Sequence, residues 1–356
     1  MSLRDYFFFI TLAILIGYIM VVGKLVIMPI LVAIMLSYIL MGAVNTMSGW
    51  PAFKSLPHWV LFAIALSIFA LTILSVGLVA VANLRNIASS AAQYQDNVMT
   101  IVARGAEALD LGDVPTWATL RSLTLDRIDM GAASLGLLGS IASIGGYTVL
   151  IMTYAGFMIA ERGNFDHKLT LIFGKPEDRA AAFDVVSRIN AQIVTYLFTK
   201  TLINIALGLI SYVLMLVLGI ENAVFWAFLI AIFNYIPYVG SLVGVGVVVV
   251  YSIAQFGALR PAAATLVLLT AAQVYVGNWL EPRMMSRSMN LSPFVVLAAL
   301  VVWSSLWGVA GAIIAVPMTS ILVIIFGAFE RTRAIPILLS RDGHFEVAGV
   351  GKVRSS

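Results

Sequence analysis

Cysteine and charge are both scarce in this sequence. Of its 356 residues, 11% are charged and 61% are hydrophobic, and none is cysteine. An average soluble domain has about 25% charged residues, so this composition excludes an ordinary soluble protein and a disordered tail. The lack of cysteine also excludes a secreted disulfide scaffold, a thiolate metal site and a cysteine nucleophile.

Residues that carry catalysis or bind metals are few as well. His58, His167 and His344 are far apart in sequence and lie in or beside predicted loops, which favours isolated histidines over a metal site. The nucleotide and hydrolase motifs GxxxxGKS/T, GxSxG and HExxH and the EF-hand loop are absent. We therefore predict no enzyme activity, no metal and no cofactor. The net charge of +4 does not predict nucleic-acid binding, because membrane proteins concentrate Lys and Arg on their cytoplasmic side.

Long uncharged runs are abundant. Eight of them cover 228 residues, so all 38 charged residues lie in the other 128. About 20 apolar residues are enough to span a bilayer as a helix. The sequence therefore predicts an all-α polytopic membrane protein in contact with the lipid bilayer. The runs are 6–23, 25–53, 55–84, 130–160, 201–220, 222–259, 261–280 and 288–329.

The alternation of apolar and polar segments predicts six regions along the chain. Apolar residues recur at helical spacing from Leu84 to Leu109, which predicts an amphipathic helix. Pro176, followed by two acidic residues, predicts the start of another amphipathic helix that leads into a span at 197–219. The regions are an N-terminal three-span block (1–83), an amphipathic extracytoplasmic segment (84–130), a fourth span (131–160), a cytoplasmic amphipathic helix (161–199), a C-terminal transport core (200–330) and a cytoplasmic tail (331–356).

The two longest runs are too long for one crossing. Runs 222–259 and 288–329 have 38 and 42 residues, which as helices would measure about 57 and 63 Å against a hydrocarbon core of about 30 Å. Each run is either a pair of spans or a hairpin. The first breaks at Pro237 and Gly240, and the second near Gly308. We predict about six full transmembrane helices plus two Pro/Gly-broken helical hairpins, an arrangement that often builds transporter sites.

The distribution of basic residues predicts the orientation. With both runs as hairpins and the N-terminus inside, the inner segments hold 15 Lys and Arg and the outer segments hold 6. This excess agrees with the positive-inside rule and places both termini in the cytoplasm. The two hairpins would then enter from opposite sides and meet at mid-membrane.

Three polar breaks supply the candidate residues for solute binding or gating. Carbonyl groups freed by a proline, amide side chains and hydroxyl groups are suited to a polar ligand. Glu281 is the acidic residue nearest to a predicted membrane core, and we take it as a candidate for coupling to an ion. The candidates are Asn234, Tyr235, Pro237, Tyr238 and Gly240 in the first break, Gln273, Asn278, Glu281 and Pro282 around the second, and Trp303, Gly308 and Gly311 in the third.

Each candidate also has a purely structural interpretation. The first break would then be a kink with interfacial tyrosines, and the third a packed helix crossing. Glu281 would form an ion pair with Arg283 or Arg287 that ends its helix. Lys200 would extend to the cytoplasmic interface. Single polar residues in spans, such as Asn204 and Gln273, would form hydrogen bonds between helices.

Three motifs carry a family resemblance: NYIPYVG at 234–240, Asn278 with Glu281-Pro282 followed by Leu291-x-Pro293, and Trp307-Gly308-x-x-Gly311 with Pro317. In these motifs the chain resembles the autoinducer-2 exporter family of bacterial membrane proteins, and the similarity covers about residues 5–340. The resemblance implies an inner-membrane protein from a family that includes exporters of the quorum-sensing furanone autoinducer-2 and reported sodium or lithium/proton antiporters. It also implies a homo-oligomer, with pentamers described. Ser241 stands where the family pattern often has proline.

These residues and the resemblance leave three possible functions of the chain. The first is secondary export of a small neutral polar metabolite such as autoinducer-2, which suits a core with amides and hydroxyls but almost no ionisable groups. The second is sodium or lithium/proton antiport, which normally needs carboxylates in the membrane, and only Glu281 is near. The third is a non-transporting membrane scaffold, in which the amphipathic segments would make oligomer contacts.

Overall fold

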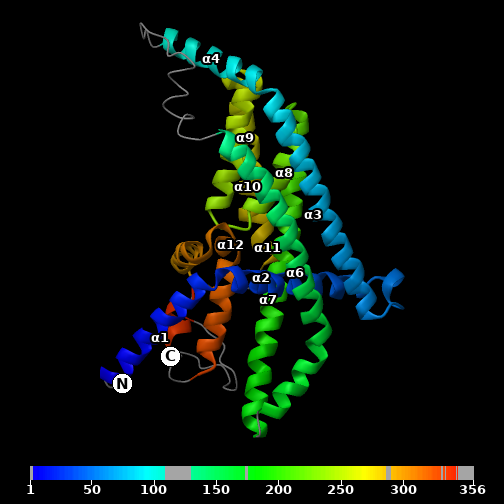
Figure 1. Cartoon of the computed structure of the whole chain (residues 1–356), viewed down its shortest axis with the longest axis vertical. Coiled ribbons are helices and arrows are strands. Elements are labelled where there is room, and N and C mark those ends of the chain that lie inside the picture. Colours follow the sequence, from blue (N-terminus) through cyan, green and yellow to red (C-terminus); the bar gives the residue numbers. More distant parts are fainter. Residues whose placement is uncertain are drawn as a thin grey trace. The chain divides into compact units, whose positions relative to one another are not determined.

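The predicted all-α architecture is confirmed. In the computed structural model, the described residues are 3–108, 130–172, 175–285, 290–329, 332, 334–341 and 343. They form helices joined by short turns (Figure 1), and the strand pairing among them is limited to one isolated bridge between Leu291 and Ser340.

The helices of the described residues fall into two groups in chain order. The first group is α1 (Leu3–Val22), α2 (Lys24–Ser48), the short 3-10 helix η1 (Pro51–Phe53), α3 (His58–Ser89), α4 (Ala91–Ala108), α6 (Met130–Ile172) and α7 (Pro176–Val217). The second group is α8 (Ala223–Phe233), α9 (Val239–Phe256), α10 (Leu259–Tyr275), the π-helical segment η2 (Val276–Leu280), α11 (Glu281–Met284), α12 (Pro293–Gly327) and α13 (Ala334–Leu339).

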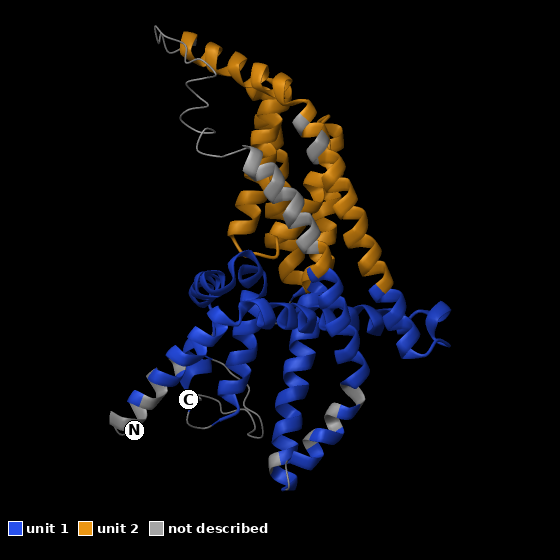
Figure 2. Ribbon diagram, viewed as in Figure 1, with its two compact units in different colours: residues 1–66, 147–199, 285–356 blue, residues 67–146, 200–284 orange. Residues whose placement is uncertain are grey.

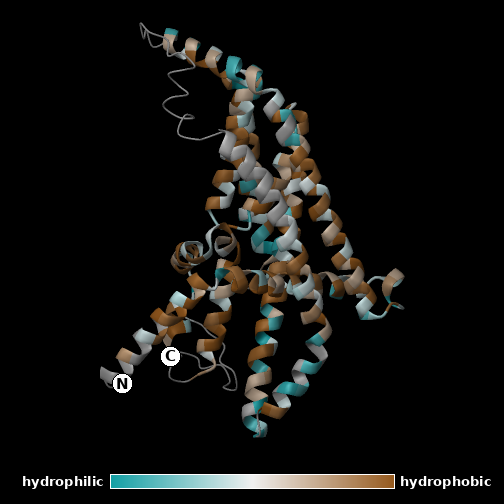
Figure 3. Cartoon of the chain, in the orientation of Figure 1, coloured by the Kyte–Doolittle hydropathy of each residue, from teal (hydrophilic) through white to brown (hydrophobic). Residues whose placement is uncertain are grey.

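Six helical stretches within the described residues are long and apolar enough to cross a membrane. Figure 3 shows apolar residues along much of α3 and α12, and polar residues near the adjoining ends of α6 and α7. Lipid offers no hydrogen bonds to the backbone, so helices of this length and composition suit a bilayer. The stretches are Lys24–Ser48, His58–Asn83, Arg179–Val217, Val239–Phe256, Leu259–Met284 and Pro293–Gly327.

Two predicted helix boundaries are confirmed and one is wrong. The turn between the first two spans lies at Gly23, and α7 begins at Pro176. The amphipathic helix expected from Leu84 onward is divided: α3 continues to Ser89, and a separate helix, α4, begins after Ser90. Helix α3 thus continues for several residues beyond the apolar run that ends at Leu84, because helical hydrogen bonding continues through the first polar residues.

The chain divides into two compact units (Figure 2). Unit 1 consists of residues 1–66, 147–199 and 285–356, and unit 2 of residues 67–146 and 200–284. The boundaries proposed from sequence for the six regions stay predictions.

Unit 1 has a core built around α2, α7 and α12. Its buried residues include Met35, Ile193 and Leu197, which pack with Trp303 and Trp307. A hydrogen bond of 2.9 Å from the Tyr38 hydroxyl to Asn190 Oδ1 joins α2 to α7. The apolar faces of these three helices therefore cover one another, which is the expected way for helices to bury side chains.

Helix α12 folds back on itself, so the second predicted hairpin is confirmed. Trp307 and Gly308 have non-helical backbone angles, with φ of 62° at Gly308. The Trp303 Nε1 donates to Thr319 Oγ1 at 3.0 Å. In a continuous helix, residues this far apart would be separated by about 24 Å. The hydrogen bond therefore requires the two halves to lie side by side.

Unit 2 contains the first predicted hairpin. Helix α8 is followed by the turn 234–238 and by α9, which packs against α8, α10 and α4 (Figure 1). The Asn97 Nδ2 of α4 donates to the carbonyl oxygens of Ala254 and Gln255 at 2.9 and 2.8 Å. These carbonyls lie at the C-terminal end of α9, where helices lack internal partners. Helix α4 therefore caps α9.

Because the two hairpins belong to different units, their predicted meeting at mid-membrane stays a prediction.

Candidate functional site

The turn between α8 and α9 is tight and strained. Pro237 interrupts the helical hydrogen bonding, and the Val239 N–H donates to the Pro237 carbonyl at 2.6 Å. Tyr238 lies between them with φ of 61° and ψ of −54°. This is the backbone geometry of a γ-turn, which residues other than glycine rarely adopt. Such strain costs about 1–3 kcal/mol and is concentrated at functional sites. The Tyr238 side chain is exposed.

Gly240 allows α9 to begin directly against the end of α8. A Cβ atom at this position would overlap the Phe233 carbonyl oxygen. The Gly240 N–H donates to the Ile236 carbonyl at 3.0 Å, which closes the turn. The glycine of the NYIPYVG sequence is therefore required by a close backbone approach.

A polar cluster connects this turn to α7. The Asn234 Nδ2 donates to Asn204 Oδ1 at 2.8 Å. The hydroxyl groups of Thr201 and Tyr235 share a hydrogen bond of 2.7 Å. We define the polar cluster as these four residues together with Lys200 and Glu281. Its amides and hydroxyls lie between helices that are otherwise apolar, where unpaired polar groups would be costly.

Lys200 and Glu281 form the charged part of the cluster. The Lys200 Nζ lies 2.7 Å from Glu281 Oε1, and the two side chains are 6% and 29% exposed. Lys200 and Asn204 are four residues apart on α7 and therefore share one face of that helix. The pair places a positive and a negative charge next to each other, so the cluster carries no net formal charge.

The helix before Glu281 is widened. Residues 276–280 form a π-helix, and the Glu281 N–H donates to the Val276 carbonyl. Pro282 follows, and a proline removes a helical donor and clashes with the carbonyl four residues earlier. A π-helical turn relieves this clash and is frequent at functional sites. It also leaves Asn278 and Pro282 exposed while Glu281 faces Lys200.

The predicted Glu281–Arg283 ion pair is wrong. The Arg283 guanidinium carbon lies 3.6 Å from the centre of the Trp279 ring, which stacks in turn on Tyr275. Two residues apart on a helix, Glu281 and Arg283 do not face each other. Arg287, the other partner considered for Glu281, lies outside the described residues. The expectation that Lys200 extends to the interface is also wrong, because its side chain is buried.

Three fully buried side-chain donors in unit 2 have no hydrogen-bond partner among the described residues. They are the Nδ2 of Asn204, the Nε1 of Trp226 on α8 and the Nε2 of Gln273 on α10. Leaving a buried donor unsatisfied costs about 1–3 kcal/mol. A polar solute or water that accepts hydrogen bonds from these amides would remove that cost.

The third break lies in unit 1 and has a cavity of its own. Trp303 is buried and donates to Thr319, whereas a Cβ atom on Gly311 would overlap the Trp303 carbonyl oxygen. A cavity of about 430 Å³ is lined by Gly308, Lys24 and Tyr147, among others. Trp303 and Gly311 therefore hold the hairpin together, while Gly308 faces open space.

Comparisons with known proteins agree with this architecture. The model of the AI-2E family of transporters matches residues 8–331. The chain belongs to the AI-2E transporter family. It is 25% identical to the AI-2 transport protein TqsA of Escherichia coli over 315 residues, which are 88% of this chain and 89% of that protein. It is 26% identical to a candidate transport protein of Haemophilus influenzae over 322 residues, 88% of this chain and 90% of the relative.

A shorter match reaches higher identity. A candidate transport protein of Borreliella burgdorferi is 30% identical over 192 residues, 54% of this chain and 53% of the relative. This AI-2E family member is thus a multi-pass membrane protein of a bacterial transporter family, which confirms the resemblance drawn from the three motifs.

Sequence reasoning missed part of the site in this AI-2E chain. The hydrogen bond between helices that the sequence predicts for Asn204 is confirmed by its contact with Asn234. The prediction did not include the pairing of Lys200 with Glu281 or the contact of Thr201 with Tyr235. The spacing of Lys200, Thr201 and Asn204 on one helix is a signal that was available, since three polar residues within five positions are unusual in a span. Among the described residues no group of three His, Cys, Asp or Glu side chains could hold a metal ion. The groups of the polar cluster form hydrogen bonds and an ion pair with one another.

Proposed function

We propose that this chain is a secondary transporter that exports a small neutral polar metabolite, with autoinducer-2 as the first candidate. The polar cluster supports this proposal. It offers amides and hydroxyls, and its two charges are already paired at 2.7 Å. A neutral solute that exchanges hydrogen bonds with Asn204 and Asn234 would not need to displace a charge, which would be costly in this apolar setting.

The name of the E. coli relative points to the same solute, since that protein is called an AI-2 transport protein. At 25% identity the name suggests a substrate for testing. The candidate residues would act in two ways. Asn204, Asn234 and Gln273 would bind the solute, and the strained turn at Tyr238 would move during transport.

The direct test is flux through reconstituted protein in everted vesicles. We expect uptake of autoinducer-2 above that of protein-free vesicles, measured with and without a proton gradient. Folded, well-inserted protein that transports none of a panel of neutral polar metabolites would contradict export. The absence of all flux would favour a membrane scaffold.

Replacing Asn204 or Asn234 with leucine tests the role of the cluster. Each change removes a partner from the 2.8 Å hydrogen bond. We expect kcat/KM for transport to fall about tenfold, the equivalent of about 1.4 kcal/mol, because the remaining amide loses its partner. Asn45→Leu, at an exposed position of α2, is the matched control and is expected to transport normally. Normal flux in both cluster variants would place solute binding elsewhere.

Antiport of sodium or lithium against protons is the alternative function, and Glu281 is the observation that favours it. A carboxylate that is only 29% exposed is suited to exchange a proton for a cation. This alternative predicts sodium- or lithium-dependent proton flux that is lost in Glu281→Gln. Proton flux that is independent of both cations would contradict it.

We further propose that the chain resides in the bacterial inner membrane with both termini in the cytoplasm, and that it forms a homo-oligomer, with a pentamer as the first state to test. The 15 to 6 distribution of Lys and Arg supports the orientation. Labelling in intact cells of single cysteines introduced at each terminus tests the orientation, and mass measurement in detergent tests the oligomer.

A further inference from the structure

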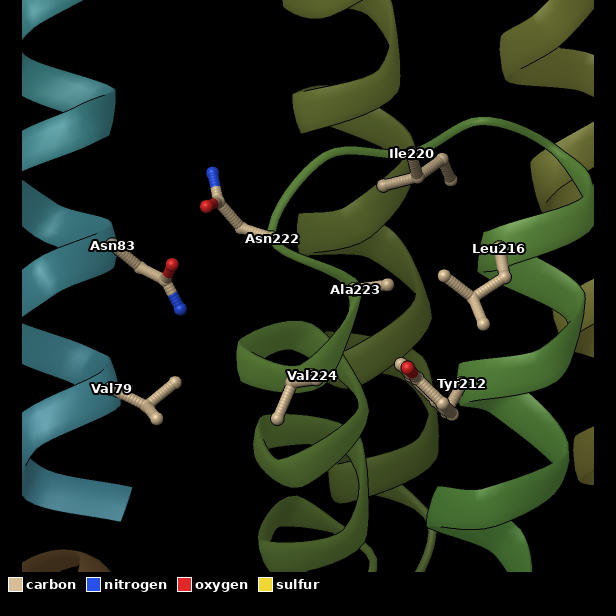
Figure 4. Close-up of a pocket in the computed structure, with 8 residues that line it drawn as sticks. All are labelled: Val79, Asn83, Tyr212, Leu216, Ile220, Asn222, Ala223 and Val224. Atoms are coloured by element: carbon tan, nitrogen blue, oxygen red, sulfur yellow. The ribbon is translucent and has the colours of Figure 1, made fainter. Parts of the chain in front are cut away.

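A pocket in unit 2 lies apart from the residues of the polar cluster. It is situated between the end of α3 and the junction of α7 and α8, and it has a volume of about 350 Å³ (Figure 4). Small-molecule sites usually measure about 300–1,000 Å³, so the pocket has room for a small solute. None of its eight lining residues belongs to the sequence motifs.

Asn83 is a buried amide directed into this pocket. Figure 4 shows its side chain reaching from α3 toward Asn222 and Ala223 at the start of α8. It is only 9% exposed, and the described part of the chain offers it no hydrogen-bond partner. Its amide lines the pocket and is therefore available to a polar ligand there.

Two more neutral polar groups line the same pocket. Asn222 has a left-handed backbone, with φ of 57°, and its Nδ2 donates to the Tyr251 hydroxyl at 3.2 Å. This bond fixes the amide while leaving its oxygen available as an acceptor. Tyr212 adds a hydroxyl from α7. Donors and acceptors thus come from two different sides of the pocket.

The remaining lining is apolar and determines the class of ligand. Val79, Leu216 and Val224 contribute aliphatic surface, and none of the eight lining residues is charged. A phosphate or carboxylate would therefore lack a counter-charge here. A small neutral molecule with hydroxyl or carbonyl groups on one side and carbon on the other matches the lining.

We propose that this pocket is a second binding site for a small, neutral, hydroxylated solute, with Asn83 as its specificity-determining residue. The inference rests on the proposed function, since the same class of solute would occupy both sites. In the predicted orientation α3 ends on the extracytoplasmic side, so the pocket would receive solute leaving the polar cluster.

The absence of cysteine allows a clean protection experiment. Leu216→Cys places a thiol on the pocket wall, and Leu209→Cys places one two turns away on the same exposed face of α7. Detergent-solubilised protein is labelled with N-ethylmaleimide in the presence of autoinducer-2, glycerol or xylitol. At a solute concentration about three times its Kd, labelling of Leu216→Cys should slow about fourfold, while Leu209→Cys should not change.

The same assay identifies the residue responsible. Adding Asn83→Leu should abolish protection, whereas Asn86→Leu, at an exposed position one turn further along α3, should preserve it. Equal labelling with and without all three solutes, or protection that survives Asn83→Leu, would overturn the proposal. Flux of each solute through the parent protein is measured in parallel. Flux without protection would refute the second site alone, and protection without flux would refute export alone.

Discussion

Replacing Glu281 with leucine should destabilise the protein more than replacing Lys200 with methionine. Either change leaves one charge of the 2.7 Å pair without its partner, but Lys200 is 6% exposed and Glu281 is 29% exposed. Breaking a buried ion pair by removing one partner costs about 3–5 kcal/mol. We expect Glu281→Leu to reach that range and Lys200→Met to fall below it, because water still reaches the carboxylate.

The double variant Lys200→Met/Glu281→Leu should be more stable than Glu281→Leu alone. Removing both charges leaves no unpaired ion in the apolar interior, and an apolar pair of similar size is often no less stable than a buried ion pair. Thermal unfolding in detergent, followed for the two single variants and the double variant, gives the coupling between the residues.

The exposed ion pair between Lys168 and Glu161 is the matched control. Its side chains are 55% and 69% exposed, and exposed pairs contribute about 0–1 kcal/mol. Lys168→Met is therefore expected to leave the unfolding temperature nearly unchanged. Equal effects of Lys168→Met and Lys200→Met would show that burial of the pair does not matter.

Transport by the double variant separates a structural from a functional role of the pair. If the pair only stabilises the fold, the folded double variant will transport normally. If Glu281 couples transport to an ion, the double variant will fold but will lose the response to a proton gradient.

The sequence predicted the hairpins because their signals are local. A run of 38 or 42 uncharged residues exceeds one crossing, and proline and glycine interrupt each run at one place. Chain length and backbone chemistry were enough to place the turns near Pro237 and Gly308. Helix starts such as Pro176 are local in the same sense.

The ion pair was not predicted because its signal is not local. Lys200 and Glu281 are 81 positions apart, and the nearest cation in sequence, Arg283, seemed the natural partner. The π-helical turn before Pro282 determines which way Glu281 faces, and Arg283 packs over the Trp279 ring instead of pairing with Glu281. Neither contact is visible in periodicity or composition. The register of Trp303 against Thr319 in the α12 hairpin is likewise a product of tertiary packing.

Replacing Gly240 with alanine is expected to abolish transport and to lower stability strongly. The new Cβ would overlap the Phe233 carbonyl oxygen, and a backbone atom cannot move aside as a flexible side chain can. Overpacking in a well-packed core costs about 1–3 kcal/mol, and a direct backbone overlap should lie at or above the top of that range. The turn would open, and Asn234 and Tyr235 would separate from α7.

Gly244→Ala is the matched control for this prediction. It lies one turn further along α9, and its Cβ would meet the nearest atom of Ile230 at 3.5 Å, an ordinary contact. Alanine also favours the helical state by about 1 kcal/mol relative to glycine. We therefore expect Gly244→Ala to unfold at the same or a higher temperature than the parent and to transport normally, while Gly240→Ala does neither. Similar behaviour of the two variants would mean that the turn tolerates a side chain at Gly240, and the close approach of α9 to α8 would then not determine the geometry of the polar cluster.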